Sequence, residues 1–140
     1  MSGFLRIEHL GIAVSDLEKA NQLFHLLCNQ PHYKVEKVAS ENVSTSFFKI
    51  GESKIELVQA GDANGAIAKF IEKRGEGIHH VAFEVENILE EMERLKKAGF
   101  QLLNDVPKKG ADNKLICFVH PKSTGGILLE LTQEITQTEG

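Results

Sequence analysis

The stretch IHHVAFEVENILEEMERLKKAG, residues 78 to 99, changes from one structural period to another along its length. Apolar and polar residues alternate over 78–85, which predicts a strand. Asn87, with Glu90 three residues later, is a capping pair that marks where a helix begins. The predicted helix has one apolar face, formed by Ile88, Met92 and Leu95. The stretch therefore predicts a strand followed by an amphipathic helix, with Gly99 as its left-handed end.

The same pattern occurs earlier in the chain. IEHLGIAVSDLEKANQLFHLL, residues 7 to 27, has the same order of an isoleucine, any residue, a histidine, an apolar strand, a polar cap and an amphipathic helix. Its capping pair is Ser15 and Glu18. Further along each half, SKIELVQ (53–59) and GGILLELT (125–132) share a short apolar strand that contains Glu-Leu. Each half is thus predicted to form a strand, a helix, and two or three more strands.

A chain of 140 residues with 41% hydrophobic and 26% charged residues fits one globular domain. We predict a single domain, 1–140, made of two pseudo-symmetric modules at about 5–60 and 76–133. The segment 61–75 is the predicted connector, with a short helix near 66–73, and 134–140 is predicted to be a flexible tail.

The net charge of −4 and the scattered basic residues give no reason to expect a nucleic-acid partner. Apolar runs fall short of the roughly 20 residues that a spanning helix needs, so no membrane partner is expected. The start MSGFLRIEH has the pattern of neither a signal nor a transit peptide, and we predict a cytoplasmic protein. Cys28 and Cys117 have no CxxC spacing and are predicted to be buried thiols with no chemical task.

The internal repeat selects four polar residues. His80 aligns with His9, and Glu130 aligns with Glu56, with spacings of 47 and 50 residues inside the two halves. Duplicated modules pair economically around a pseudo-two-fold axis, which would bring equivalent residues toward one place. Charged residues in the middle of apolar strands seldom lie on an inner face without a partner.

Strand alternation separates the two neighbouring histidines of the second half. It places His80 on the face that would hold a ligand and His79 on the face that the helices cover. The predicted partners on the inner face are Ile7, Gly11 and Ala13 for His9, and Ile78, Ala82 and Glu84 for His80. The small residues among them would leave room for a ligand.

Two imidazoles and two carboxylates are a suitable set of ligands for a divalent metal ion, with no thiolate to favour a closed structural zinc site. We therefore predict that His9, Glu56, His80 and Glu130 bind a divalent ion. Co²⁺, Mn²⁺, Ni²⁺ and Zn²⁺ all suit such ligands, so the pattern leaves the identity of the metal open.

The chain also resembles a known family over residues 5 to 133. The motifs that carry the resemblance are IEHLGIAV, KIELV, AKFIEKRGEGIHHVAFEV and FVHPKSTGGILLEL. They resemble the methylmalonyl-CoA epimerase family of the vicinal-oxygen-chelate superfamily. The resemblance implies an α+β fold in which two tandem βαβββ modules form a curved mixed sheet around a metal site, in a homodimer.

The resemblance also implies an activity. It is the interconversion of the (R) and (S) forms of methylmalonyl-CoA, a CoA thioester, by 1,1-proton transfer through a metal-stabilised enediolate. The same four metal ligands are implied, with Glu130 and Glu56 as the catalytic residues. Some members have glutamine at the position of Glu56 and a separate glutamate as one base; here that stretch, ENVSTSFF, offers Thr45 instead. The identity of the second base therefore stays open, with Glu41 and His120 as further candidates.

Two other functions remain as alternatives. One is a glyoxalase I-type lactoylglutathione lyase, which would share the metal and the enediolate. The other is a non-catalytic protein of the same fold that binds a small molecule.

Overall fold

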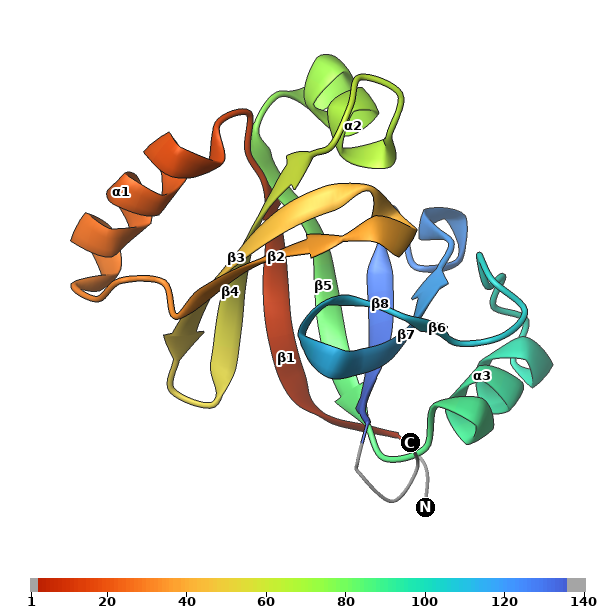
Figure 1. Ribbon diagram of the computed structural model, residues 1–140. Helices are drawn as coiled ribbons and strands as arrows, with labels where there is room; N and C mark the ends of the chain where they lie inside the picture. Colours follow the sequence, from red (N-terminus) through yellow and green to blue (C-terminus); the bar gives the residue numbers. More distant parts are fainter. Residues whose placement is uncertain (1–2, 136–140) are drawn as a thin grey trace. The chain divides into compact units, whose positions relative to one another are not determined.

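The computed structural model describes residues 3–135, which form two compact units (Figure 1). One unit contains His9–His79, and the other contains 3–8 together with 80–135. The eight strands are β1 (Phe4–Ala13), β2 (Lys34–Val38), β3 (Val43–Ile50), β4 (Ser53–Ala60), β5 (Gly77–Val85), β6 (Lys108–Lys109), β7 (Lys114–Val119) and β8 (Leu129–Glu134). The helices are α1 (Leu17–Cys28), α2 (Ala66–Arg74) and α3 (Ile88–Lys97), with short 3₁₀ helices at Ala39–Glu41, Ala111–Asn113 and Pro121–Ser123.

In the His9–His79 unit, the strand order is β2-β3-β4-β1. The pairs β2–β3 and β3–β4 are antiparallel, whereas β1 runs parallel to β4. A parallel neighbour requires a crossover connection, and α1 lies in the chain between β1 and the later strands of the unit. In Figure 1 the yellow ribbon of β4 runs beside β1.

The other unit repeats this arrangement with β5-β8-β7-β6. Here β5 runs parallel to β8, and the pairs β7–β8 and β6–β7 are antiparallel. In both units the strand that precedes the helix thus pairs with the last strand of the module. The α+β class, the internal repeat and the mixture of parallel and antiparallel pairing are confirmed. The exact module bounds stay a prediction, and residues 136–140 of the expected tail lie outside the described residues.

The caps of two helices show how local sequence sets their boundaries. Asn87 caps α3 as predicted, because its side chain accepts a hydrogen bond from the backbone N–H of Glu90 at 3.1 Å. The prediction for α1 was one residue off: Asp16, not Ser15, accepts from the N–H of Lys19 at 3.1 Å. Aspartate and serine are both good caps, so their order in Ser-Asp does not decide between them. Ser15 instead donates its backbone N–H to Glu76 at 2.8 Å.

Each unit buries the apolar face of its own helix. Helix α1 packs on β3 and β4 of the His9–His79 unit, and α3 packs on β7 and β8 of the other. The core under α1 contains Val14, Leu17, Ala20, Phe48 and Leu57, and the core under α3 contains Val85, Ile88, Met92, Leu95, Cys117, Val119 and Leu131. A third apolar cluster, Ala13, Val58 and Ile67, packs with α2 in the His9–His79 unit.

The two cysteines differ in burial. Cys117 is fully buried, and burial raises the pKa of its thiol to about 11. Cys28 is half-buried at the last position of α1. With this pKa, only about one part in a thousand of the Cys117 thiol is ionised at pH 8. Because the thiolate is the reactive form, Cys117 should react slowly.

We expect a disulfide reagent at pH 8 to modify Cys28 in the folded protein and Cys117 only after denaturant is added. A Cys28→Ser variant, which leaves only Cys117, is the control and should show no fast reaction while folded. Fast modification of Cys117 in that variant would contradict the buried assignment.

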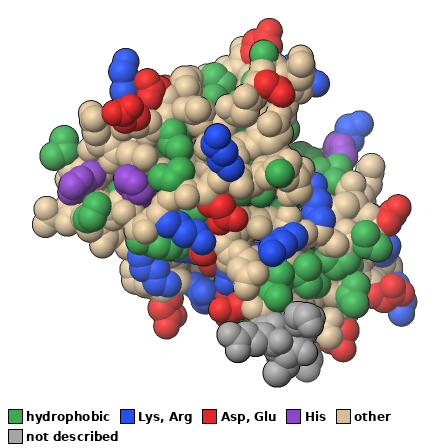
Figure 2. Space-filling model, viewed as in Figure 1, with side chains coloured by type: hydrophobic (Ala, Val, Ile, Leu, Met, Phe, Trp, Pro, Cys, Tyr) green, Lys and Arg blue, Asp and Glu red, His purple; other side chains and the backbone are tan. Residues whose placement is uncertain are grey.

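Within residues 3–135, no helix is long and apolar enough to cross a membrane. On the face drawn in Figure 2, lysine and arginine side chains are dispersed among acidic and neutral ones. This distribution agrees with the expectation that nucleic acid is not a partner, which stays a prediction.

Candidate metal centre

The first candidate pair lies in the His9–His79 unit. His9 lies on β1 and Glu56 on the parallel strand β4, where the Cα partner of Glu56 is Gly11. His9 Nδ1 lies 3.2 Å from Glu56 Oε2, and the two residues are 4% and 5% exposed. Because Gly11 has no side chain, the carboxylate can lie beside the imidazole two positions along the neighbouring strand.

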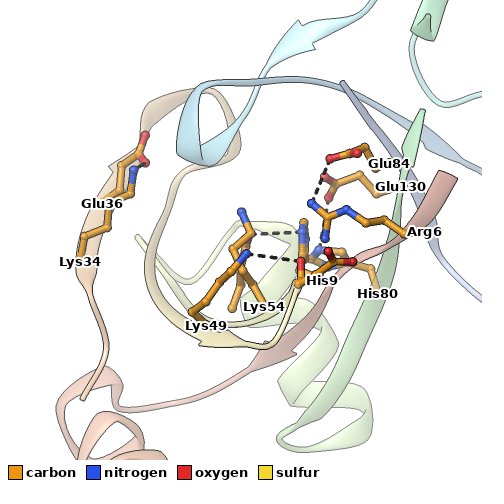
Figure 3. A network of polar contacts seen from close by, with 11 residues as sticks. Arg6, His9, Lys34, Glu36, Lys49, Lys54, His80, Glu84 and Glu130 are labelled. Atoms are coloured by element: carbon orange, nitrogen blue, oxygen red, sulfur yellow. Dashed lines mark hydrogen bonds and ion pairs between the residues drawn. The ribbon is translucent and has the colours of Figure 1, made fainter. Parts of the chain in front are cut away.

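The second pair is built in the same way in the other unit. His80 lies on β5 and Glu130 on the parallel strand β8, where the partner of Glu130 is the small residue Ala82. His80 Nε2 lies 3.2 Å from Glu130 Oε1. The ring of Phe118 packs edge-on against the His80 ring, with centroids 5.8 Å apart. Figure 3 labels His80 and Glu130 together with a neighbouring ion pair, Arg6–Glu84, whose charged atoms are 3.0 Å apart.

The prediction that only one of the two neighbouring histidines faces the polar side agrees with their contacts. The His79 ring packs edge-on against Phe70 of α2, with centroids 5.0 Å apart. His79 thus packs on helix α2, while His80 pairs with Glu130.

The residues predicted to share a strand face with the two histidines differ in burial. Gly11, Ala13 and Ala82 are buried, but Ile7 is 47% exposed and Ile78 is 63% exposed. Sequence reasoning also missed Glu8, which is 2% exposed next to the buried His9. In a strand with one exposed face, strict alternation buries only every second residue. It therefore does not predict that Glu8 and His9 are both buried. The only signal in the sequence was a carboxylate between the apolar residue Ile7 and His9.

The remaining candidates for the second base have other surroundings. Thr45 is 2% exposed and lies opposite Val58, and a threonine hydroxyl is a poor base at neutral pH. His120 accepts the backbone N–H of Lys122 on Nδ1 at 3.0 Å, so it caps a 3₁₀ helix. Glu41 lies in the 3₁₀ helix before β3. Thr45 is therefore a poor base, whereas Glu41 and His120 stay candidates.

The donor chemistry of the two pairs fits a divalent metal. Each unit offers one imidazole nitrogen and one carboxylate, all in residues that are no more than 8% exposed. Burying a carboxylate is costly unless it has a charged partner or binds a metal. Imidazole and carboxylate ligands suit Zn²⁺, Co²⁺, Ni²⁺ and Mn²⁺. Each pair is thus a candidate half of a metal site.

Each of the two units thus combines a strand-helix-strand arrangement with a parallel His–Glu strand pair. Residues 8–118 match the family model of the Glyoxalase/Bleomycin resistance protein/Dioxygenase superfamily. The chain belongs to this superfamily.

Several of the relatives that the chain matches are named as epimerases. The chain is 38% identical to the ethylmalonyl-CoA/methylmalonyl-CoA epimerase of Cereibacter sphaeroides over 91% of its own length and 97% of the relative. It is 36% identical to the mitochondrial methylmalonyl-CoA epimerase of Mus musculus, over 91% of the chain and 72% of the relative.

A solved structure agrees with these relatives. A variant of Streptomyces coelicolor methylmalonyl-CoA epimerase in complex with 2-nitronate-propionyl-CoA has a TM-score of 0.92 and 28% identity, covering 96% of this chain and all of that chain. The predicted resemblance and the prediction of an epimerase-type enzyme are confirmed.

Proposed function

We propose that this chain interconverts the (R) and (S) forms of methylmalonyl-CoA, and that His9, Glu56, His80 and Glu130 bind one divalent metal ion for this reaction. The main support is the occurrence of a buried His–Glu pair at the equivalent place in each unit of a chain whose relatives are named for this activity. One pair supplies two ligands, whereas these metals take four to six. A single ion would therefore use both pairs.

A bound ion would supply Lewis-acid stabilisation of the negative charge that develops on the substrate oxygens, worth several kcal/mol (order of magnitude). The protein's own residues must move the proton. One carboxylate takes the proton from C2 as the C–H bond breaks. The electron pair of that bond passes into the thioester carbonyl. The other carboxyl group, which is protonated at this point, then gives its proton to C2 on the opposite face, so that the configuration inverts. Glu56 and Glu130 are the residues that we assign to these two faces.

The test is an isotope experiment. The protein is loaded separately with Co²⁺, Mn²⁺, Ni²⁺ or Zn²⁺ and incubated with one epimer of methylmalonyl-CoA in D₂O. We expect the other epimer to form and deuterium to enter at C2, as followed by chiral analysis and mass spectrometry. If none of these metals supports exchange, the epimerase proposal is wrong.

Parallel reactions with a different substrate distinguish the epimerase from a glyoxalase I-type lyase. A glyoxalase I-type lyase would convert the hemithioacetal of methylglyoxal and glutathione, and we expect no such product. Formation of lactoylglutathione without any exchange on methylmalonyl-CoA would favour the lyase. The CoA thioester as the partner, the homodimer and the cytoplasmic location are part of the same proposal.

A further inference from the structure

Lys54 is a buried lysine next to one of the two proposed catalytic carboxylates. Its side chain is only 5% exposed, and its Nζ lies 3.7 Å from Glu56 Oε2. The same oxygen lies 3.2 Å from His9 Nδ1. One oxygen of Glu56 therefore contacts both an imidazole and an ammonium group, all within the His9–His79 unit. Figure 3 shows His9 and Lys54 of this contact.

The strands hold Lys54 in this position. It lies on β4 two residues before Glu56, so the two side chains share a face of the sheet. Its Cα partner on β1 is His9, and its Nζ lies 5.6 Å from the centre of the Phe47 ring. Burying an ammonium group is costly unless a partner compensates it. The contact with Glu56 is therefore built into the strand register and does not depend on a flexible surface side chain.

The internal repeat is broken at this residue. The position two residues before Glu130 is Leu128, so the second unit has an apolar side chain where the first has Lys54. The backbone is equivalent, because Val81 donates its N–H to Leu128 O beside the His80 position. Glu56 and Glu130, equivalent by symmetry, thus differ by one neighbouring positive charge at this position.

We propose that Lys54 is a positioning residue that weakens the hold of the metal on Glu56, so that this carboxylate can leave the metal when it exchanges a proton with C2. This inference rests on the proposed function. An ammonium group competes with a cation for the lone pairs of the carboxylate and repels the cation itself. A metal ion would therefore bind Glu56 more weakly in the presence of Lys54 than in its absence. In the step itself the C2–H bond breaks, the proton goes to Glu56, and the electron pair enters the thioester.

The main variant is Lys54→Met, which removes the charge and keeps an unbranched apolar stem. We expect its metal affinity, measured by competition with a chelator, to increase on the order of tenfold. Because Glu56 would then stay on the metal, kcat for inversion should fall on the order of tenfold with little change in KM.

Lys34, on β2, provides a matched control on the same face of the sheet. Lys34 Nζ lies 5.0 Å from the centre of the same Phe47 ring, but it pairs with Glu36 at 3.3 Å. Lys34→Met removes the same charge beside the same ring and should leave metal affinity and inversion unchanged. An equal effect in both variants would mean that net charge alone is responsible, and would overturn the role of Lys54.

A double-mutant cycle isolates the contact with Glu56. Lys54→Met should no longer tighten metal binding when Glu56→Gln is also present, because the glutamine has no carboxylate charge to release. A purely structural lysine would change the melting temperature without this dependence. Unchanged metal affinity in Lys54→Met, or tightening that persists beside Glu56→Gln, would overturn the proposal. Lys54→Gln serves for the same cycle if Lys54→Met does not fold.

The cycle separates this inference from the function on which it rests. A wild-type protein that binds metal but does not epimerise methylmalonyl-CoA would contradict the proposed function only, since the metal-affinity cycle still decides the role of Lys54. A wild-type protein that binds none of the four metals would overturn both.

Discussion

Replacing His80 with alanine is expected to weaken metal binding by more than about a hundredfold, whereas His79→Ala retains the metal. His80 pairs with Glu130 in a buried contact of 3.2 Å, and His79 packs on Phe70 of α2. Removing His80 takes away one nitrogen ligand of the proposed site. Elemental analysis after dialysis, together with a chelator competition, measures the difference.

His79→Ala is also the control for folding. It should cost about 0.5–1.5 kcal/mol of stability, through loss of the edge contact between rings. Circular dichroism must show that both variants keep the wild-type secondary structure before their metal contents are compared. Loss of metal from the His79 variant alone would mean that the assignment of faces on β5 is wrong by one residue.

Much of this fold could be predicted because two independent signals in the sequence agree. Alternation and helical periodicity identified β5 and α3, and the repeat carried the same interpretation to β1 and α1. The repeat also located His9, Glu56, His80 and Glu130 as equivalent pairs. The parallel pairing of β1 with β4 and of β5 with β8 then gives these residues their short contacts within each unit.

Other features depend on positions that periodicity does not specify. Asp16 caps α1 in place of the predicted Ser15. Periodicity does not choose between them, because aspartate and serine are both good cap residues. Glu8 is buried because the alternation of β1 is interrupted beside His9. Lys54 gave no signal, since a lysine in a short strand is usually solvated, and only the strand register shows that it lies beside Glu56. Symmetry in the sequence thus predicted what the two halves share, but not where they differ.

Replacing either proposed base with glutamine is expected to reduce inversion by about 10²–10⁴-fold, the usual contribution of a positioned acid or base. Glu56→Gln and Glu130→Gln each remove one proton acceptor and keep an oxygen that can still reach the metal. Isotope exchange, unlike inversion, should be lost on only one face of the substrate. The remaining carboxylate can still take a proton from its own face and return deuterium to the same face.

The two variants should therefore label opposite epimers of methylmalonyl-CoA in D₂O. Glu84→Gln is the matched control, because Glu84 lies on β5 near the second pair but is bound to Arg6 at 3.0 Å, and it should leave inversion nearly unchanged. Elemental analysis must show that all three variants retain metal. If Glu56→Gln inverts at nearly the normal rate, Glu56 is only a ligand, and the second base must be sought at Glu41 or His120. If both variants label the same epimer, the two carboxylates do not serve opposite faces, because a base can exchange only the proton that points toward it.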